Sequence, residues 1–425
     1  MASRPADIPA AVPADPAEGS GPVLRARYFP CFEGLRALAA VAVVVHHAAS
    51  NAGPVRAGFL ATPAAVMDGG VSIFFVISGF LLYRPFVAAG AEGRPPTPPH
   101  RFWWRRFLRI VPAYWVALTV LWGLGWITVG EQWWRFYLFL QVYDPFTTLN
   151  GIVPAWSLNT EVTFYLFVPL WALVLRYVLG RGRPSLRLEL AGALSLVAAG
   201  YVSRVLFSAS DRVWAIGFEG QEVTMRSISF AWLPNQIDLF ALGMVLAVLS
   251  VWAGQRPDLR ARLDRLARPA GAWWAAAAAA WLALAYFVGD ASHNGGYQGG
   301  YWQLRQATLG FVAVALLVPA VFGDQDRGVI RGGLRSRPVV WLGAVSYGLY
   351  LWHLDVIEEV PGWLDRVPGQ VPIVVLLAAG LVGGTAAAAV SWYAIERPLQ
   401  RLRRDRPNLA VTPPAAGAGD SGGQA

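Results

Sequence analysis

The sequence predicts an all-α polytopic membrane protein: a transmembrane helix bundle of about ten spanning helices, with both termini in the cytoplasm. Of its 425 residues, 56% are hydrophobic and 14% are charged, whereas a soluble domain carries about a quarter charged residues. The apolar residues gather in long runs, and arginines gather in alternate segments between them. A chain this apolar cannot cover its own surface in water, so we expect it to lie in a lipid bilayer.

Ten apolar runs predict the spanning helices, because a helix needs about 20 mostly apolar residues to cross a bilayer. They cover residues 32–50, 66–89, 107–129, 156–179, 188–207, 236–252, 273–288, 304–322, 339–360 and 371–393. The aromatic segment 133–143 is too short to span, so we expect it to lie at the interface or to re-enter the membrane.

We expect one transmembrane domain over residues 28–400, flanked by disordered cytoplasmic tails at 1–27 and 401–425. The first tail is rich in Ala, Pro and Asp and has no apolar run of the signal-peptide type. The last segment has a similar composition, and no soluble domain follows the membrane part in this sequence.

The placement of arginine predicts the orientation of the chain. One set of segments is rich in arginine: Arg101, Arg105, Arg106 and Arg109; Arg181, Arg183 and Arg187; Arg256, Arg260, Arg262, Arg265 and Arg268; Arg331, Arg335 and Arg337. The alternate segments hold single arginines, except that Arg204, Arg212 and Arg226 accompany the connection between the fifth and sixth runs. Excess positive charge faces the cytoplasm, so the net charge of +9 needs no nucleic-acid partner.

The chain contains no lysine and much alanine and glycine, a composition typical of a GC-rich bacterial genome. We therefore expect a multi-pass protein of the bacterial inner (cytoplasmic) membrane. Cys31 is the only cysteine, which excludes a disulfide or a thiolate metal site within one chain. No bound metal or resident cofactor is expected.

The first run carries an arginine and a histidine on one helix face. Arg36 and His47 are eleven residues apart, which is three turns plus about 20°, with a rise of about 16 Å. Ionisable residues inside a membrane usually face a polar interior and mark functional sites. His46 points roughly 80° away from Arg36, so His47 is the candidate catalytic histidine. The alternative is that Arg36 only reaches the interface and His47 caps a helix end.

Glu161 lies inside the otherwise apolar fourth run, close to its start. A buried carboxylate needs a cationic or histidine partner. The predicted orientation places Glu161 and His47 in the outer halves of their helices, so the two side chains could meet.

Arg105, Arg106 and Arg109 form a cluster at the start of the third run, with Arg106 and Arg109 on one helix face. Guanidinium groups in such a cluster suit phosphate or pyrophosphate. The alternative is a purely orienting charge that contacts anionic lipids.

Further polar and small residues are candidates to line a cavity within the bundle. Ser72 and Ser78 in the second run either leave room for a ligand or let helices approach closely. Ser346, Tyr350 and His353 form a polar stripe at i, i+4 and i+7, which either lines the cavity or joins helices.

Seven motifs, in order, carry a resemblance to a known family. They are GLRALAA…HH, GVSIFFVISGFLL, RRFLRIVPAYW, PAWSLNTEVTFY, IDLFALGM, LGAVSYGLYLWH and IERPL. Together they extend over most of the chain, and the sequence resembles the acyltransferase 3 family of membrane acyltransferases. The resemblance implies transfer of an acyl group from cytoplasmic acyl-CoA to a hydroxyl of a carbohydrate, glycolipid or macrolide acceptor.

The resemblance also implies roles for particular residues. The family's arginine–histidine pair falls on Arg36 and His47, and its Arg-x-x-Arg element falls on Arg106 and Arg109. Its WSLxxE element begins at Trp156, which we place in the cavity, and ends at Glu161. Many members have Asp where this chain has Ser72, so a second acidic partner is missing here, and many have Asp at Glu33, which is a conservative change. Some members also carry a soluble domain after the membrane part. The resemblance therefore implies that this membrane domain acts alone or with a separate envelope-biosynthesis partner.

The expected mechanism joins these residues. Acyl-CoA binds at the cytoplasmic face with its phosphates near Arg106 and Arg109. His47 acts as a general base or is transiently acylated, Glu161 stabilises the imidazolium, and Arg36 stabilises developing negative charge. Two alternatives remain: a transporter or flippase of an envelope glycan precursor, and a catalytically inactive scaffold.

Overall fold

The computed structural model describes residues 29–148, 150–209, 213–216, 222–288 and 299–402. The expected N-terminal tail, and the expected C-terminal tail from residue 403 on, lie outside the described residues. Residues 401 and 402 belong to the last helix, α17 (Arg397–Leu402), so helix extends slightly past the predicted domain boundary.

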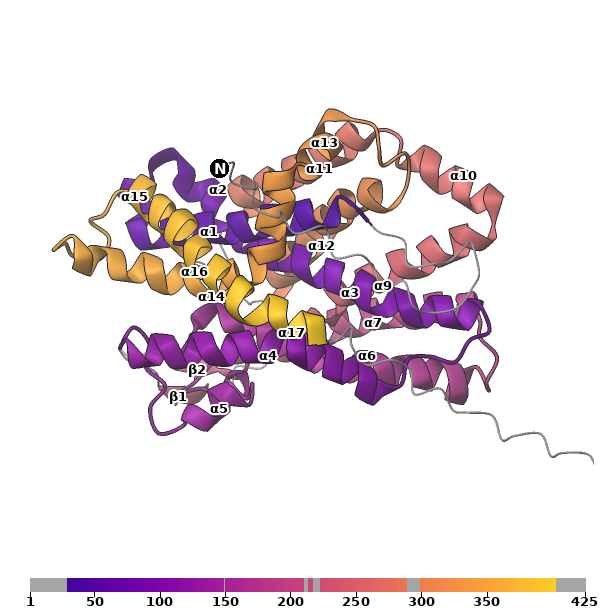
Figure 1. Cartoon of the computed structure of the whole chain (residues 1–425), viewed down its shortest axis with the longest axis horizontal. Helices are drawn as coiled ribbons and strands as arrows, with labels where there is room; N and C mark the ends of the chain where they lie inside the picture. Colours follow the sequence, from indigo (N-terminus) through magenta and orange to yellow (C-terminus); the bar gives the residue numbers. More distant parts are fainter. Residues whose placement is uncertain (1–28, 149, 210–212, 217–221, 289–298, 403–425) are drawn as a thin grey trace, which may run out of the picture.

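Each of the ten predicted runs coincides with a long helix or a helical segment (Figure 1). These are α1 (Phe32–Ala57), α3 (Gly70–Ala91), α4 (Pro99–Gly123), α6 (Trp156–Leu173), α7 (Leu186–Ser208), α9 (Leu233–Gln255), α11 (Ala270–Ala283), α12 (Gly299–Val321), α14 (Arg337–Trp363), and α15 (Ile373–Ala378) with α16 (Gly384–Ser391). π-helical stretches continue three of these helical segments. η5 (Val174–Leu179) follows α6, η7 (Leu284–Val288) follows α11, and η8 (Ala379–Gly383) and η9 (Trp392–Glu396) follow α15 and α16.

In the described part of the chain, eight helical segments are long and apolar enough to cross a membrane. The other two predicted spans correspond to α4 and α14, which are 25 and 27 residues long. Charged residues interrupt both helices: α4 begins with the arginine cluster, and α14 carries Asp355, Glu358 and Glu359 near its end. The chain is a multi-pass, predominantly helical membrane protein.

Short elements connect the long helices. They include α2 (Ala61–Ala65), α5 (Trp133–Tyr137), α8 (Met225–Ser229), α10 (Pro257–Leu266) and α13 (Val329–Leu334), together with η1 (Gly58–Leu60), η2 (Met67–Gly69), η3 (Gln141–Tyr143) and η4 (Val153–Ala155). A short antiparallel hairpin, β1 (Val213–Ile216) and β2 (Glu222–Thr224), lies between α7 and α9 and was not predicted.

The aromatic segment 133–143 forms no spanning helix, as predicted. It contains the short helix α5 and the turn η3. Tyr114 of α4 donates a hydrogen bond to the Phe136 carbonyl (3.1 Å), and the Trp115 indole donates to the Tyr137 carbonyl (2.8 Å). These bonds hold α5 against the end of α4.

Glycines allow the central helices to approach closely. A Cβ on Gly79 of α3 would lie 2.0 Å from the Phe240 carbonyl oxygen of α9, and one on Gly243 of α9 would lie 2.0 Å from the Val76 carbonyl oxygen of α3. Small residues at such crossings bring two backbones into direct contact. A glycine also allows α1 to pack closely against α14, because a Cβ on Gly343 would lie 2.0 Å from the Glu33 carbonyl oxygen.

Arg204 explains why the connection between the fifth and sixth runs looked richer in arginine than its neighbours. It lies in α7 and is 3% exposed, and its guanidinium makes a two-pronged ion pair with Asp238 of α9 at 2.8 and 2.9 Å. Arg204 is therefore a buried ion-pair partner and not a loop charge that orients the chain.

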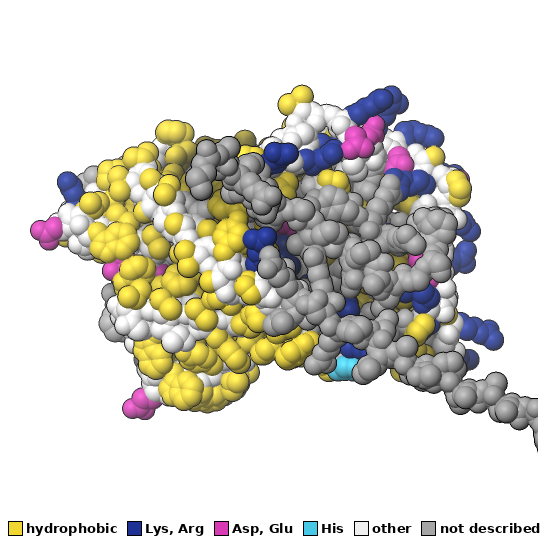
Figure 2. All heavy atoms as spheres, in the orientation of Figure 1, with side chains coloured by type: hydrophobic (Ala, Val, Ile, Leu, Met, Phe, Trp, Pro, Cys, Tyr) yellow, Lys and Arg dark blue, Asp and Glu magenta, His cyan; other side chains and the backbone are white. Residues whose placement is uncertain are grey.

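The face of the molecule drawn in Figure 2 has an apolar part and an arginine-rich end. Figure 2 shows a broad hydrophobic surface on the left and most of the arginines toward the right, around α10. An apolar belt with positive charge at one end is the pattern that a bilayer and the positive-inside rule require.

Candidate functional site

His47 and His353 form a hydrogen-bonded pair between α1 and α14. Nδ1 of His47 lies 2.9 Å from Nε2 of His353. The other ring nitrogen of His353, Nδ1, lies 3.0 Å from the Leu349 carbonyl oxygen of the preceding helical turn. His353 is fully buried, at 0% exposure, whereas His47 is half-buried. The close packing of α1 along α14 brings these residues together although 306 positions separate them.

His46 faces a different environment, as the helical geometry predicted. Its Nδ1 lies 3.0 Å from the Ala64 carbonyl oxygen of α2. Its ring packs edge-on against the ring of His47 at a centroid distance of 5.1 Å. His46 thus ties α1 to the connection that follows it, and His47 faces α14.

Glu161 accepts two hydrogen bonds on the same carboxylate oxygen. The hydroxyl of Ser78 on α3 donates to Oε1 at 2.6 Å, and the hydroxyl of Tyr165, one turn later on α6, donates at 2.7 Å. The suggested meeting of Glu161 with His47 does not take the form of a hydrogen bond, because His47 is bonded to His353 instead. Tyr165 was missed by sequence reasoning, although its i+4 spacing from Glu161 was a usable signal.

Arginines from α1 and α4 surround the Glu161–Tyr165 pair. Arg36 and Arg106 both interact electrostatically with Glu161, and Arg109 lies within electrostatic range of Arg36 and Arg106. The Arg106 guanidinium lies 5.9 Å from the ring centre of Tyr165, within cation–π distance. We call Arg36, Arg106, Arg109, Glu161 and Tyr165 the arginine–glutamate centre.

The arginines are partly compensated by acidic neighbours. Arg36 pairs with Glu33 at 3.7 Å, as their (i, i+3) spacing in the sequence predicts. Glu396 is 3% exposed and lies within electrostatic range of Arg36 and Arg109. Glu396 belongs to the motif IERPL, for which the sequence alone predicts a structural cap. Nothing in this local sequence shows that the end of the last run returns to α1 and α4.

Arg106 keeps one free donor. Among the described residues, its buried Nε has no hydrogen-bond partner. Arg105 is half-buried and lies within electrostatic range of Arg106. A buried guanidinium with an unused donor is the kind of group that binds an anionic oxygen.

The predicted cavity-lining residues mostly join helices in this structure. Ser346 and His353 are 0% exposed, and Ser346 donates to the Gly343 carbonyl at 2.8 Å. The Tyr350 hydroxyl lies 2.7 Å from the Ser157 hydroxyl and 2.9 Å from the Pro154 carbonyl oxygen, which links α14 to the start of α6. This favours the helix-joining interpretation for Tyr350, whereas the hydrogen bond of Ser346 stays within α14.

Two of the three remaining residues of that group, Ser72 and Trp156, are also packed. Ser72 is 6% exposed. Trp156 is half-buried, and its ring centre lies 4.9 Å from that of Phe230. Ser78 differs from both, because its hydroxyl belongs to the Glu161 hydrogen-bond group.

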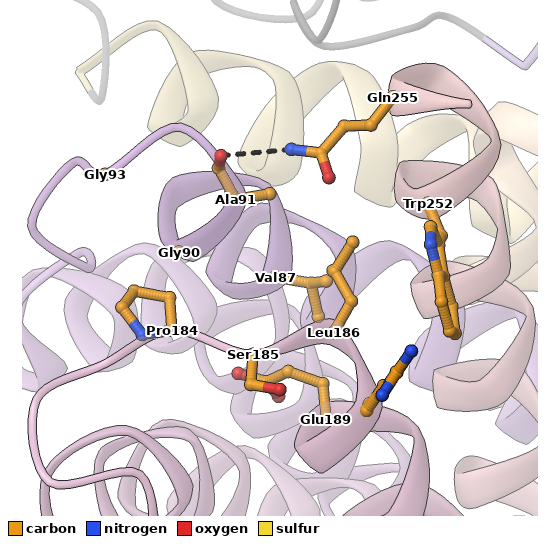
Figure 3. A pocket seen from close by; sticks show the side chains of 11 residues that line it. Val87, Gly90, Ala91, Gly93, Pro184, Ser185, Leu186, Glu189, Trp252 and Gln255 are labelled. Carbon is orange, nitrogen blue, oxygen red and sulfur yellow. Dashed lines mark hydrogen bonds between the residues drawn. The ribbon is translucent and has the colours of Figure 1, made fainter. Parts of the chain in front are cut away.

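A separate pocket of about 460 Å³ opens between the end of α3, the start of α7 and the end of α9 (Figure 3). Val87, Leu186 and Trp252 face one another across it, and Gln255 donates a hydrogen bond to the Ala91 carbonyl at 3.1 Å. None of its lining residues belongs to the His47–His353 pair or to the arginine–glutamate centre. In the described part of the chain, no three His, Cys, Asp or Glu side chains are grouped as metal ligands.

Comparison with known proteins identifies a family and several relatives of this chain. The model of the family described as "Acyltransferase domain" matches residues 29–394. The O-acetyltransferase OatA of Staphylococcus aureus (strain NCTC 8325 / PS 47) is 25% identical over 392 residues, covering 88% of this chain and 58% of that protein. The peptidoglycan O-acetyltransferase OatA of Listeria monocytogenes is 25% identical over 399 residues, covering 88% of this chain and 56% of that protein.

This chain therefore spans a little more than half the length of these two relatives. No solved structure matches it significantly. The family model covers most of the chain, including the His47–His353 pair and the arginine–glutamate centre. The chain belongs to the acyltransferase 3 family.

Proposed function

We propose that this chain is a membrane O-acyltransferase that moves an acetyl or other short acyl group from acyl-CoA to a hydroxyl of a carbohydrate acceptor. The observation that carries the proposal is the arrangement of two polar centres along one helix. Arg36 and His47 both lie on α1, separated by about 16 Å along its axis at 1.5 Å per residue. One centre is rich in guanidinium groups and the other holds a half-buried imidazole.

Coenzyme A suits such a separation. Its phosphates carry the negative charge, its thioester carries the reacting carbonyl, and a long flexible arm connects the two. The free Nε of Arg106, with Arg105 and Arg109 beside it, is the expected phosphate contact. The arm then extends along the bundle and brings the thioester to His47.

The proposed chemistry at His47 is general-base catalysis. The imidazole takes the proton of the acceptor hydroxyl while the hydroxyl oxygen attacks the thioester carbonyl. The carbon–sulfur bond breaks, and the thiolate of CoA leaves and takes the proton from the imidazolium. Covalent catalysis through an acyl-imidazole uses the same residue and the same leaving group.

Glu161 and Arg36 act on charge in this scheme. The carboxylate of Glu161 compensates the positive charge of Arg36 and Arg106, and Arg36 stabilises negative charge on the donor. The acceptor class is inferred from the relatives, two of which are named as acetyltransferases, one of them for peptidoglycan. Glycolipids and macrolides remain acceptors to compare with polysaccharide.

The test is acyl transfer by the purified full chain in lipid vesicles. Radiolabelled acetyl-CoA is supplied on one side, with peptidoglycan fragments, a glycolipid or a macrolide as acceptor. Label appearing on an acceptor, or slow CoA release that depends on His47, supports the proposal. Translocation of a glycan precursor without CoA release would support a transporter instead, and neither activity would indicate a scaffold.

A further inference from the structure

We infer that His353 is a positioning residue that makes Nε2 of His47 the reacting nitrogen. This inference rests on the proposed function, because it assigns the atom that performs the chemistry. It also goes further, since it gives a fully buried residue of α14 a task in catalysis without contact with substrate.

The hydrogen bonds around the pair determine where the protons lie. A carbonyl oxygen only accepts hydrogen bonds, so the 3.0 Å contact with Leu349 requires a proton on Nδ1 of His353. A neutral imidazole with its proton on Nδ1 has an acceptor lone pair on Nε2. The 2.9 Å contact then requires that Nδ1 of His47 carries a proton and donates it to Nε2 of His353.

The proton on Nδ1 determines the protonation state of the other ring nitrogen of His47, Nε2. With its single proton on Nδ1, neutral His47 has an unprotonated Nε2. That nitrogen is free to take a proton from a hydroxyl or to attack a carbonyl.

Burial separates the tasks of the two histidines. His353 is 0% exposed, with one ring nitrogen bonded to Leu349 and the other to His47, so neither nitrogen can reach a substrate. Its backbone is also confined, because a Cβ on Gly384 of α16 would lie 3.2 Å from the His353 Cα. His47 is half-buried and keeps its second nitrogen available. A ring held in this way is a fixed support for a reacting group.

The pair also accommodates the change in charge during reaction. When Nε2 of His47 accepts the hydroxyl proton, the ring becomes an imidazolium with protons on both nitrogens. Its Nδ1–H continues to donate to the neutral Nε2 of His353, so no hydrogen bond is lost. When Nε2 returns the proton to the thiolate, the pair is restored to its starting state.

Substitutions of His353 test the inference with a built-in control. In His353→Gln the amide oxygen can occupy the position of Nε2 and accept from His47, but it cannot act as a base. In His353→Asn the shorter side chain reaches only the position of Nδ1, so the bond to His47 is lost. We expect His353→Asn and His353→Ala to lower kcat by about 10- to 100-fold, by analogy with the partners that orient metal-bound histidines. The donor KM should stay near its original value, and His353→Gln should retain most of kcat.

The tautomer is measured independently of activity. Solid-state ¹⁵N NMR of the histidine-labelled full chain in bilayers should show His47 protonated on Nδ1, and only five histidines contribute signals. Each variant is first matched to the original protein in elution volume and thermal stability. Equal kcat in His353→Asn and the original protein would overturn the inference, as would a proton on Nε2 of neutral His47 or a Gln variant as impaired as the Asn variant. Failure of the proposed function is distinguishable, because then the original protein transfers no acyl group while the NMR result still reports the tautomer.

Discussion

Ser78 of α3 donates a 2.6 Å hydrogen bond to the Glu161 carboxylate of α6, and the carboxylate oxygen that accepts it also accepts the Tyr165 hydroxyl. Two neutral donors thus fix the orientation of a carboxylate whose charge compensates Arg36 and Arg106. The hydrogen bonds from Ser78 and Tyr165 position the Glu161 carboxylate. Its negative charge compensates the positive charge of the arginines.

The first prediction separates position from charge at Glu161. Glu161→Gln keeps an oxygen that accepts from Ser78 and Tyr165 but removes the negative charge. Ser78→Ala removes one donor and keeps the charge. We expect Glu161→Gln to lower kcat/KM strongly. We expect Ser78→Ala to lower it less, by at most the roughly 1.5–3 kcal/mol typical of a hydrogen bond to a charged group, because Tyr165 still donates to the carboxylate. If Ser78→Ala proved as damaging as Glu161→Gln, orientation and not charge would be the requirement.

The second prediction concerns the donor site. Replacing Arg106 and Arg109 together by Ala should raise the KM for acyl-CoA or lower kcat/KM, because charge-assisted hydrogen bonds to phosphate are lost. Each such bond contributes roughly 1.5–3 kcal/mol, so the loss is about tenfold to more than a hundredfold.

Arg101→Ala is the matched control for that experiment, since Arg101 lies in the first turn of the same helix and is exposed. It should leave the donor kinetics unchanged. Unchanged donor kinetics in the double variant of Arg106 and Arg109 would show that these arginines serve only to orient the chain in the membrane.

The third prediction concerns stability. Arg204 and Asp238 form a two-pronged ion pair at 3% and 6% exposure. Removing one member of a buried pair leaves an uncompensated charge, which costs about 3–5 kcal/mol. Asp238→Asn should therefore lower the thermal denaturation temperature in detergent markedly.

The exposed pair Arg327–Asp324 gives the comparison for Asp238. An exposed pair contributes about 0–1 kcal/mol, so Asp324→Asn should change the denaturation temperature little. Similar effects of the two substitutions would show that the buried pair contributes no more than a surface contact.

The sequence predicted the helices well because their signal is local. An apolar run of sufficient length is enough to predict a spanning helix, and all ten runs coincide with helices or helical segments. The same holds for the Arg36–Glu33 pair, which lies within one turn. Contacts within a helix follow from spacing alone.

Pairing between distant helices could not be predicted in this way. His47 was a candidate from its helical face, but its partner His353 lies 306 residues away, and spacing does not say which helices become neighbours. Depth in the membrane suggested Glu161 as a companion for His47, but many side chains share one depth. Glu396 was missed for the same reason, since its approach to Arg36 depends on how the last helical segment packs.

The fourth prediction concerns topology. Figure 1 places α10 and the connection between α14 and α15 at opposite ends of the molecule. The arginines of α10 predict a cytoplasmic position for it. A reporter inserted near Arg262 should read cytoplasmic, and one inserted near Gly369 should read external. The reverse pattern would contradict the orientation and, with it, the side from which the donor is expected to bind.

The last prediction compares the two adjacent histidines of α1. His47→Ala should abolish acyl transfer while the protein still folds, because no other group can supply the unprotonated nitrogen at that place. Loss of a general base alone lowers the rate by about 10²- to 10⁴-fold, and loss of a covalent carrier lowers it further. His46→Ala should retain most activity, since the His46 imidazole is bonded to the Ala64 carbonyl and faces away from His353.

Both variants are assayed for transfer in vesicles at matched amounts of folded protein. His46→Ala also serves as the control for loss of an imidazole from the same stretch of helix, so a difference between the two cannot come from helix destabilisation alone. An inactive His46 variant beside an active His47 variant would overturn the assignment of the reacting residue and move the site toward α2. Full activity in both would remove the imidazole from the mechanism, since His353 is too deeply buried to replace it.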